Sequence, residues 1–142
     1  MGGSRRRGSR HKARVRAVEI LYEAEVRGVP VSEVIERRRA QTEPPINEFT
    51  EQLATRVDEH RARIDELLET YAIGWTLDRM PVVDRNILRI GVYELLWADD
   101  IPDGVAIAEA VAMAKELSTD ESPVFVNGLL SRLMEKKPSL SL

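Results

Sequence analysis

The sequence predicts an all-α protein, a single compact domain of packed helices. Three observations carry this prediction: apolar residues recur at helical spacing, no segment shows strand-length alternation, and proline or glycine separates the helical runs. With 142 residues, 43% of them hydrophobic and 32% charged, the chain can bury one core. We expect the domain to span residues 9–137, between a disordered basic tail at 1–8 and a C-terminal tail at 138–142.

The first helix is predicted to start near Ser9, a suitable N-cap, and to stop at Gly28 in the left-handed conformation. Residues 1–16 contain seven of the 21 basic residues of the chain and none of its 24 acidic residues. Positive charge at a helix N-terminus opposes the helix dipole. This arrangement therefore indicates a polyanionic ligand.

Two helical runs follow the first helix. Ser32 is expected to cap a short helix to about residue 40, and a loop with two prolines covers residues 41–45. Asn47 caps the next run, which keeps helical spacing to about residue 72. The pattern leaves open whether this run is one helix or two joined near residues 58–61. Gly74 ends it, and residues 76–80 form at most one turn.

The segment Pro81–Trp97 is predicted to be the central helix, because it is apolar on most of its faces. Pro81 suits the first helical position, where a missing N–H does no harm. Gly91 costs about 1 kcal/mol relative to alanine in a helix interior, so we expect another helix to approach closely there. Glu94 on this buried helix needs a partner.

Two more helices complete the prediction. One is alanine-rich and spans Val105–Leu117, and the other has Ser122 as N-cap and ends before Pro138. Gly128 is expected to permit a close crossing on the last helix. The apolar stripe of this helix contains Phe125, Val126, Leu129, Leu130, Leu133 and Met134.

No catalytic constellation emerges from the sequence. The chain has no cysteine and only two histidines, His11 and His60, and it has no glycine-rich phosphate loop in a strand–helix unit. We therefore predict no catalytic residue, no metal site and no cofactor. No apolar run reaches membrane-spanning length, and the basic N-terminus lacks the apolar segment of a secretory signal, so a cytoplasmic protein is expected.

The basic N-terminal segment favours nucleic acid as the ligand. Its charges continue from the tail onto a packed helix, whereas a merely solubilising tail would not need that continuity. RNA is favoured slightly over DNA, because arginine stacks on unpaired bases and nothing resembles a DNA recognition helix. A membrane surface is a weaker alternative. Asn127, which is polar at an otherwise apolar helix start, could meet a base edge.

In combination, the motifs resemble the NusB family of bacterial transcription antitermination factors from about Arg10 to Leu133. Four blocks carry the resemblance, in order and at the family's spacing. They are Ala13-Arg14 with Ala17-Val18 and Leu21-Tyr22; Val83 to Arg89 with Tyr93-Glu94-Leu95; Pro102 with Val105 to Val111 and Ala114-Lys115; and Ser122 with Phe125-Val126-Asn127-Gly128.

The resemblance implies about seven helices in two subbundles. It also implies binding of boxA RNA from ribosomal RNA leaders together with the ribosomal protein NusE, as part of an RNA polymerase antitermination complex. Asp84 matches an acidic NusE contact of the family, and self-association as a homodimer stays open. The residues that the resemblance assigns to RNA are Arg10, His11, Lys12, Arg14, Tyr22, Phe125 and Asn127, and we expect Arg7, just upstream of the motif, to add a further RNA contact.

Two alternatives remain from the sequence. The same helical module occurs at the N-terminus of some rRNA cytosine methyltransferases, although this chain offers neither a cofactor fold nor a cysteine. A structural protein that binds a basic partner without binding RNA is the other alternative.

Overall fold

The computed structural model describes residues 2–41 and 45–142, with side chains from residue 8 onward. These residues form seven α-helices and no strand, which confirms the all-α prediction. The chain divides into two compact units, Met1–Glu59 and His60–Leu142, as the two predicted subbundles require. Most of the predicted loop at residues 41–45 lies outside the described residues.

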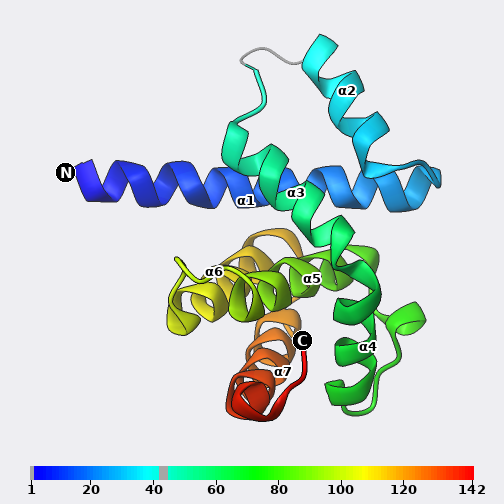
Figure 1. Ribbon diagram of the computed structural model, residues 1–142, viewed down its shortest axis with the longest axis vertical. Helices are drawn as coiled ribbons and strands as arrows, with labels where there is room; N and C mark the ends of the chain where they lie inside the picture. Colours follow the sequence, from blue (N-terminus) through cyan, green and yellow to red (C-terminus); the bar gives the residue numbers. More distant parts are fainter. Residues whose placement is uncertain (1, 42–44) are drawn as a thin grey trace. The chain divides into compact units, whose positions relative to one another are not determined.

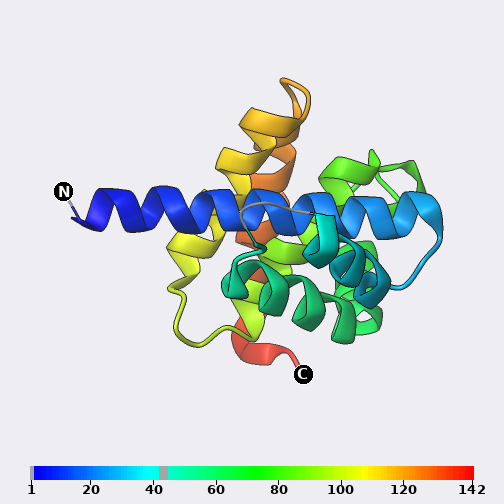
Figure 2. The same cartoon turned by 90° about the horizontal axis from the view of Figure 1, so that it is seen from above.

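The first unit contains three helices, α1 (Gly2–Arg27), α2 (Val31–Gln41) and α3 (Glu48–Glu59). The long helix α1 packs against both others, and α2 also contacts α3 (Figures 1 and 2). The buried Thr50 hydroxyl donates to the Ala13 carbonyl at 3.0 Å, which fixes α3 against α1. Gly28 ends α1 with φ of 67°, as the sequence predicts.

Helix α1 begins at Gly2, so the predicted start at Ser9 was wrong, and residues 2–8 are helical where a disordered tail was expected. Arginine is a good helix former, and a single glycine at position 8 costs only about 1 kcal/mol. No proline interrupts the segment. The helix therefore extends backward through the basic residues without needing a cap at Ser9.

The second unit contains α4 (Arg61–Tyr71), the 3₁₀ turn η1 (Leu77–Arg79), α5 (Val82–Leu96), α6 (Asp103–Leu117), α7 (Ser122–Lys136) and the 3₁₀ turn η2 (Lys137–Ser139). Within this unit α5 contacts α4, α6 and α7, and α6 packs along α7 (Figure 1). The predicted central position of α5 is thus confirmed inside the second unit.

The run after Asn47 consists of two helices, with the interruption at His60. The imidazole of His60 lies against Trp97 and Tyr93, with ring centroids 4.6 and 5.5 Å apart. These aromatic contacts attach the start of α4 to the end of α5. The amide oxygen of Asn47 accepts a hydrogen bond from the Phe49 N–H at 2.7 Å, so the predicted cap of the first of the two helices is confirmed.

Twelve of the 15 residues of α5 are buried, and Pro81 occupies the N-cap position rather than the first helical one. A Cβ added to Gly91 would lie 2.7 Å from Leu130 Cδ1 on α7 and 3.3 Å from Ala110 Cβ on α6. The predicted close approach over Gly91 is therefore confirmed. Glu94 is only 1% exposed, which agrees with its predicted place on the buried helix.

Three expectations for α7 were wrong. Glu121 takes the N-cap position and Ser122 is the first helical residue, because the Ser122 hydroxyl is bonded elsewhere. A Cβ at Gly128 would meet only the guanidinium of Arg132, at 3.5 Å, so no helix crosses there. Met134 is 37% exposed, since the core ends at Leu133.

Candidate nucleic-acid interface

The predicted basic residues of α1 do not share one face. Successive residues of an α-helix are rotated by about 100°, so Arg10 and Arg14 lie on one side and Lys12 on nearly the opposite side. Arg10 and Lys12 are exposed and His11 is half-buried, whereas Arg14 is only 3% exposed. Among the predicted basic contacts whose side chains are described, Arg10 and Lys12 are thus the most accessible to a ligand. The side chain of Arg7 lies outside the described residues.

The ring of Phe49 on α3 contacts two arginines on one side of α1, Arg10 and Arg14. The guanidinium carbons of Arg10 and Arg14 lie 4.9 and 5.4 Å from the centre of the Phe49 ring. Both distances fit cation–π contacts, which hold a cation over the face of an aromatic ring. Because Arg14 is buried in this arrangement, it supports α1 and Arg10 more than it offers a charge to solvent. In the sequence, Phe49 is visible only as one apolar residue of the helical run that follows Asn47.

The other predicted RNA contacts differ in exposure. Tyr22 on α1 is 41% exposed, and Asn127 on α7 is also exposed, so both side chains are available to a ligand. Phe125 is half-buried. Its ring forms part of a pocket within the second unit.

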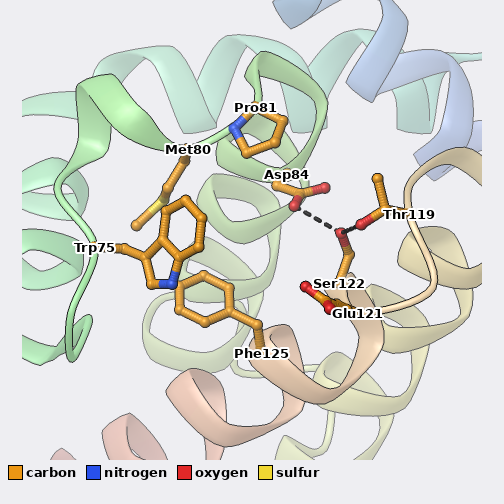
Figure 3. Close-up of a pocket in the computed structure, with 8 residues that line it drawn as sticks. All are labelled: Trp75, Met80, Pro81, Asp84, Thr119, Glu121, Ser122 and Phe125. Carbon is orange, nitrogen blue, oxygen red and sulfur yellow. Dashed lines mark hydrogen bonds between the residues drawn. The ribbon is translucent and has the colours of Figure 1, made fainter.

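This pocket has a volume of about 130 Å³ and lies between the segment that precedes α5 and the start of α7 (Figure 3). The rings of Trp75 and Phe125 lie side by side, with centroids 6.1 Å apart and planes inclined by 58°. Trp75 is 48% exposed, which is unusual for so large an aromatic residue. The lining residues are Trp75, Met80, Pro81, Asp84, Thr119, Glu121, Ser122 and Phe125.

A carboxylate with hydroxyl partners lies at the inner side of the pocket. Asp84 is 5% exposed, and its Oδ2 accepts a hydrogen bond from Ser122 Oγ at 2.8 Å while its Oδ1 accepts one from Ser118. Thr119 Oγ1 lies 2.9 Å from Ser122 Oγ. Asp84 therefore presents little surface for the protein contact that the resemblance implies, and that role stays a prediction.

Sequence reasoning missed Trp75 and the hydroxyl partners of Asp84. Trp75 stands beside Gly74, where only a break in helical spacing is visible. Ser118 and Ser122 are separated from Asp84 by more than thirty residues of sequence, so no local pattern joins them. Only the packing of α5 against the α6–α7 connection brings these groups together.

The described part of the chain offers no group of three or more histidine, cysteine, aspartate or glutamate residues that could hold a metal ion. None of its described helices is both long and apolar enough to cross a membrane. Its features of chemical interest are the basic surface of α1 and the aromatic, acid-lined pocket.

Comparisons with known proteins identify relatives over nearly the whole chain. The family model described as "NusB family" matches residues 11–135. A protein of Arthrobacter sp. (strain FB24) named "Transcription antitermination protein NusB" is 58% identical over 132 residues, which are 93% of this chain and 97% of the relative. A protein of the same name from Streptomyces avermitilis is also 58% identical, over 93% of this chain and 95% of the relative.

Solved structures give the same result. T. maritima NusB superposes with a TM-score of 0.78 at 32% sequence identity, and the match covers 92% of this chain and 97% of that one. A crystal structure of antitermination factors NusB and NusE in complex with dsRNA contains a chain that matches with a TM-score of 0.72 at 28% identity. That match covers 89% of this chain and 96% of the other.

Proposed function

Because this chain belongs to the NusB family, we propose that it is an RNA-binding transcription antitermination factor. In this proposal it binds boxA RNA of ribosomal RNA leaders together with NusE and helps RNA polymerase to read through terminators. It works as an adaptor in the cytoplasm and catalyses no reaction. Its relatives named antitermination proteins support the role, and the solved NusB–NusE complex with RNA supports the two partners.

The observation that carries RNA binding in this chain is the exposed positive charge on an ordered helix. Arg10 and Lys12 are exposed on α1, and Phe49 restricts Arg10 by a cation–π contact. A restricted arginine loses less side-chain entropy on binding a phosphate than a freely moving one does. Each phosphate contact releases counterions, so binding should weaken steeply as salt rises.

Tyr22, Asn127 and Phe125 complete the proposed RNA contacts, and His11 and Arg7 extend the basic surface. Exposed aromatic rings such as Tyr22 suit stacking on unpaired bases. For NusE, the proposal keeps acidic surface near Asp84, where exposed Glu121 adds a second carboxylate. Self-association as a homodimer stays an open part of the proposal.

The test is a salt titration of boxA RNA binding to the native chain and to a double variant, Arg10→Ala with Lys12→Ala. We expect the variant to bind about tenfold more weakly at moderate salt. Its plot of log affinity against log salt should also be shallower by about 1.4, since each single-strand phosphate contact contributes about 0.7 to the slope.

The matched control is Lys115→Ala with Lys136→Ala, which removes two exposed lysines from the second unit. If α1 carries the RNA contacts, this control should change the slope much less than the α1 variant does. Equal effects of the two double variants would mean that only net charge matters. An affinity of the α1 variant equal to that of the native chain would contradict the proposal.

The methyltransferase alternative gains no support from the relatives. The antitermination proteins match along 97% and 95% of their own length, so they resemble this chain over its extent without an additional enzymatic part. The alternative of a structural protein without RNA affinity is tested by the same titration.

A further inference from the structure

The pocket lined by Trp75 and Phe125 has the size of a single aromatic ring. Its volume is about 130 Å³, and a protein cavity of about 150 Å³ accepts one benzene molecule. The two rings and the apolar Met80 and Pro81 form its walls (Figure 3). A flat ring that enters beside Trp75 can stack on an aromatic face, which is the usual way in which proteins hold unpaired bases.

The charges of the pocket disfavour phosphate and favour a hydrogen-bond donor. Asp84 and Glu121 both line it, so a phosphate group would meet two carboxylates. Each carboxylate oxygen can accept about two hydrogen bonds, and the bonds from Ser118 and Ser122 use one acceptor position on each oxygen of Asp84. Acceptor capacity therefore remains at a site where two serine hydroxyls hold the carboxylate in place.

Among the RNA bases, cytosine combines the matching size and donor. Its single ring fits the volume, whereas a purine has two fused rings. Its exocyclic N4 amino group donates to aspartate or glutamate, and uracil presents an acceptor oxygen at the same position. A lysine or arginine of a protein partner is the competing occupant, and a loss of affinity for NusE in variants of the pocket would identify it.

We propose that this pocket binds one unpaired cytosine of the RNA, with the adjoining rings of Trp75 and Phe125 as its aromatic wall and Asp84 as the acceptor for the N4 amino group. The inference rests on the proposed RNA-binding function and adds base selectivity to it. Trp75 and Asp84 then act as specificity-determining residues, beyond the electrostatic contacts of α1.

The experiment measures binding of the full-length chain to single-stranded boxA RNA and to RNAs in which each cytosine in turn is replaced by uridine or adenosine. For the native chain we expect one position at which either replacement lowers affinity about tenfold. In Asp84→Asn the cytosine-over-uridine ratio at that position should fall to about two or less, because an amide can also donate to the uracil oxygen. Trp75→Ala should weaken binding of the unaltered RNA about fivefold.

Asp120→Asn is the matched control, since it removes an exposed acid next to the pocket residues Thr119 and Glu121 without lining the pocket. It should keep the tenfold ratio while affinity for every RNA rises slightly. Trp75→Ala provides the second test if Asp84→Asn does not fold, because half-exposed Trp75 contributes little to the core.

The outcomes separate this inference from the proposed function. Salt-dependent RNA binding without any cytosine-selective position would overturn the pocket assignment and leave the function intact. The same holds if Asp84→Asn and Trp75→Ala lower the affinity for NusE while the base preference is unchanged, which would assign the pocket to the protein partner. No RNA binding by the native chain, alone or with NusE, would overturn both.

A duplex form of the RNA should show no cytosine preference, because its bases are paired.

Discussion

Arg89 on α5 is a charged residue in the core of the second unit. It is 4% exposed, and its Nε and Nη2 donate to the two carboxylate oxygens of Asp65 at 2.8 and 3.0 Å. Its Nη1 donates to Asn86 Oδ1 at 3.0 Å. This paired geometry matches the planar fork of the guanidinium, so the ion pair joins α4 to α5 with a defined orientation.

Arg89→Ala should lower the free energy of unfolding by about 2–3 kcal/mol, because it leaves Asp65 without its main partner and opens a cavity. The loss stays at the lower end of the range for buried pairs, since Asp65 is 24% exposed. Urea denaturation of the two proteins measures the difference. Arg61→Ala, which removes a more exposed contact to Asp65 at 3.6 Å, is the control and should change stability by less than about 1 kcal/mol.

Glu23 on α1 gives the first unit a pH-dependent contribution. The Arg38 side chain from α2 donates to its Oε1 at 2.9 Å and Arg27 donates to its Oε2 at 3.0 Å. The hydrogen bond from Arg38 lowers the pKa of Glu23 below its ordinary 4.5, partial burial opposes this, and Arg27 lowers it further. A depressed carboxyl pKa stabilises the folded state above the unfolded pKa, and this stabilisation is lost as pH falls through the folded pKa.

Glu23→Gln should therefore lower the free energy of unfolding by about 0.5–1 kcal/mol at neutral pH, a value reduced by the 23% exposure of the side chain. The difference from the native chain should disappear as pH falls through the lowered pKa of folded Glu23, because the carboxyl is then protonated in both states. Thermal unfolding at several pH values measures this. Glu19→Gln, whose carboxylate lies 3.9 Å from Arg38 and is 54% exposed, should have little effect at any pH.

At the level of single residues, the sequence predicted those roles that depend on local backbone. Gly28 as a helix stop and Asn47 as a cap follow from preferences of one or two residues. Ser122 was predicted to be a cap, but its hydroxyl donates a hydrogen bond to Asp84 instead. Arg14 was expected to be accessible to RNA, but it is buried beside Phe49. Such roles depend on contacts between helices, and the spacing of residues along the chain does not reveal which helices will be in contact.

At the level of helices, the predicted order agrees with the structure, because each helix has an apolar face and a breaker at its end, whereas the number of about seven was implied by the family resemblance. The boundaries moved by a few residues, most of all at α1, where the basic segment joins the helix. The pattern could not decide between one helix and two after Asn47. The interruption coincides with His60, whose aromatic contacts come from a helix over thirty residues later.

Gly91→Ala should lower the free energy of unfolding by about 1–3 kcal/mol, although alanine is the better helix former by about 1 kcal/mol. The new methyl group would lie 2.7 Å from Leu130 Cδ1, so Leu130 or the helix α7 must move. Gly104→Ala is the control in the first turn of α6, where no atom lies within 4 Å of the added Cβ. It should leave stability unchanged or raise it slightly, as judged by thermal unfolding.

On the scale of the whole molecule, the chain consists of two units that each have buried apolar residues of their own. The second unit encloses Ile87, Leu88, Met113 and Leu129, all fully buried, among four helices. A segment of this length exceeds the roughly 60 residues at which many domains fold alone. The pocket with Trp75 and Asp84 belongs entirely to this unit.

A fragment of residues 60–142 should therefore be helical by circular dichroism and unfold cooperatively in urea, at a lower midpoint than the full chain. We expect the loss of the basic helix α1 to remove most of the salt-dependent RNA affinity, since its charges supply the phosphate contacts. A fragment with native-like RNA affinity would contradict the assignment of the electrostatic contacts to α1. A fragment that is unfolded at all temperatures would contradict the independence of the second unit.

The contact of Gly91 with Leu130 has a consequence beyond stability. Asp84 lies about two helical turns before Gly91 on α5, and Phe125 lies a little more than one turn before Leu130 on α7. The missing side chain thus sets the spacing of the two helices that carry opposite walls of the pocket. A methyl group at position 91 would push the two helices apart and widen the pocket. The width of the proposed base site at the surface therefore depends on the absence of a side chain in the core.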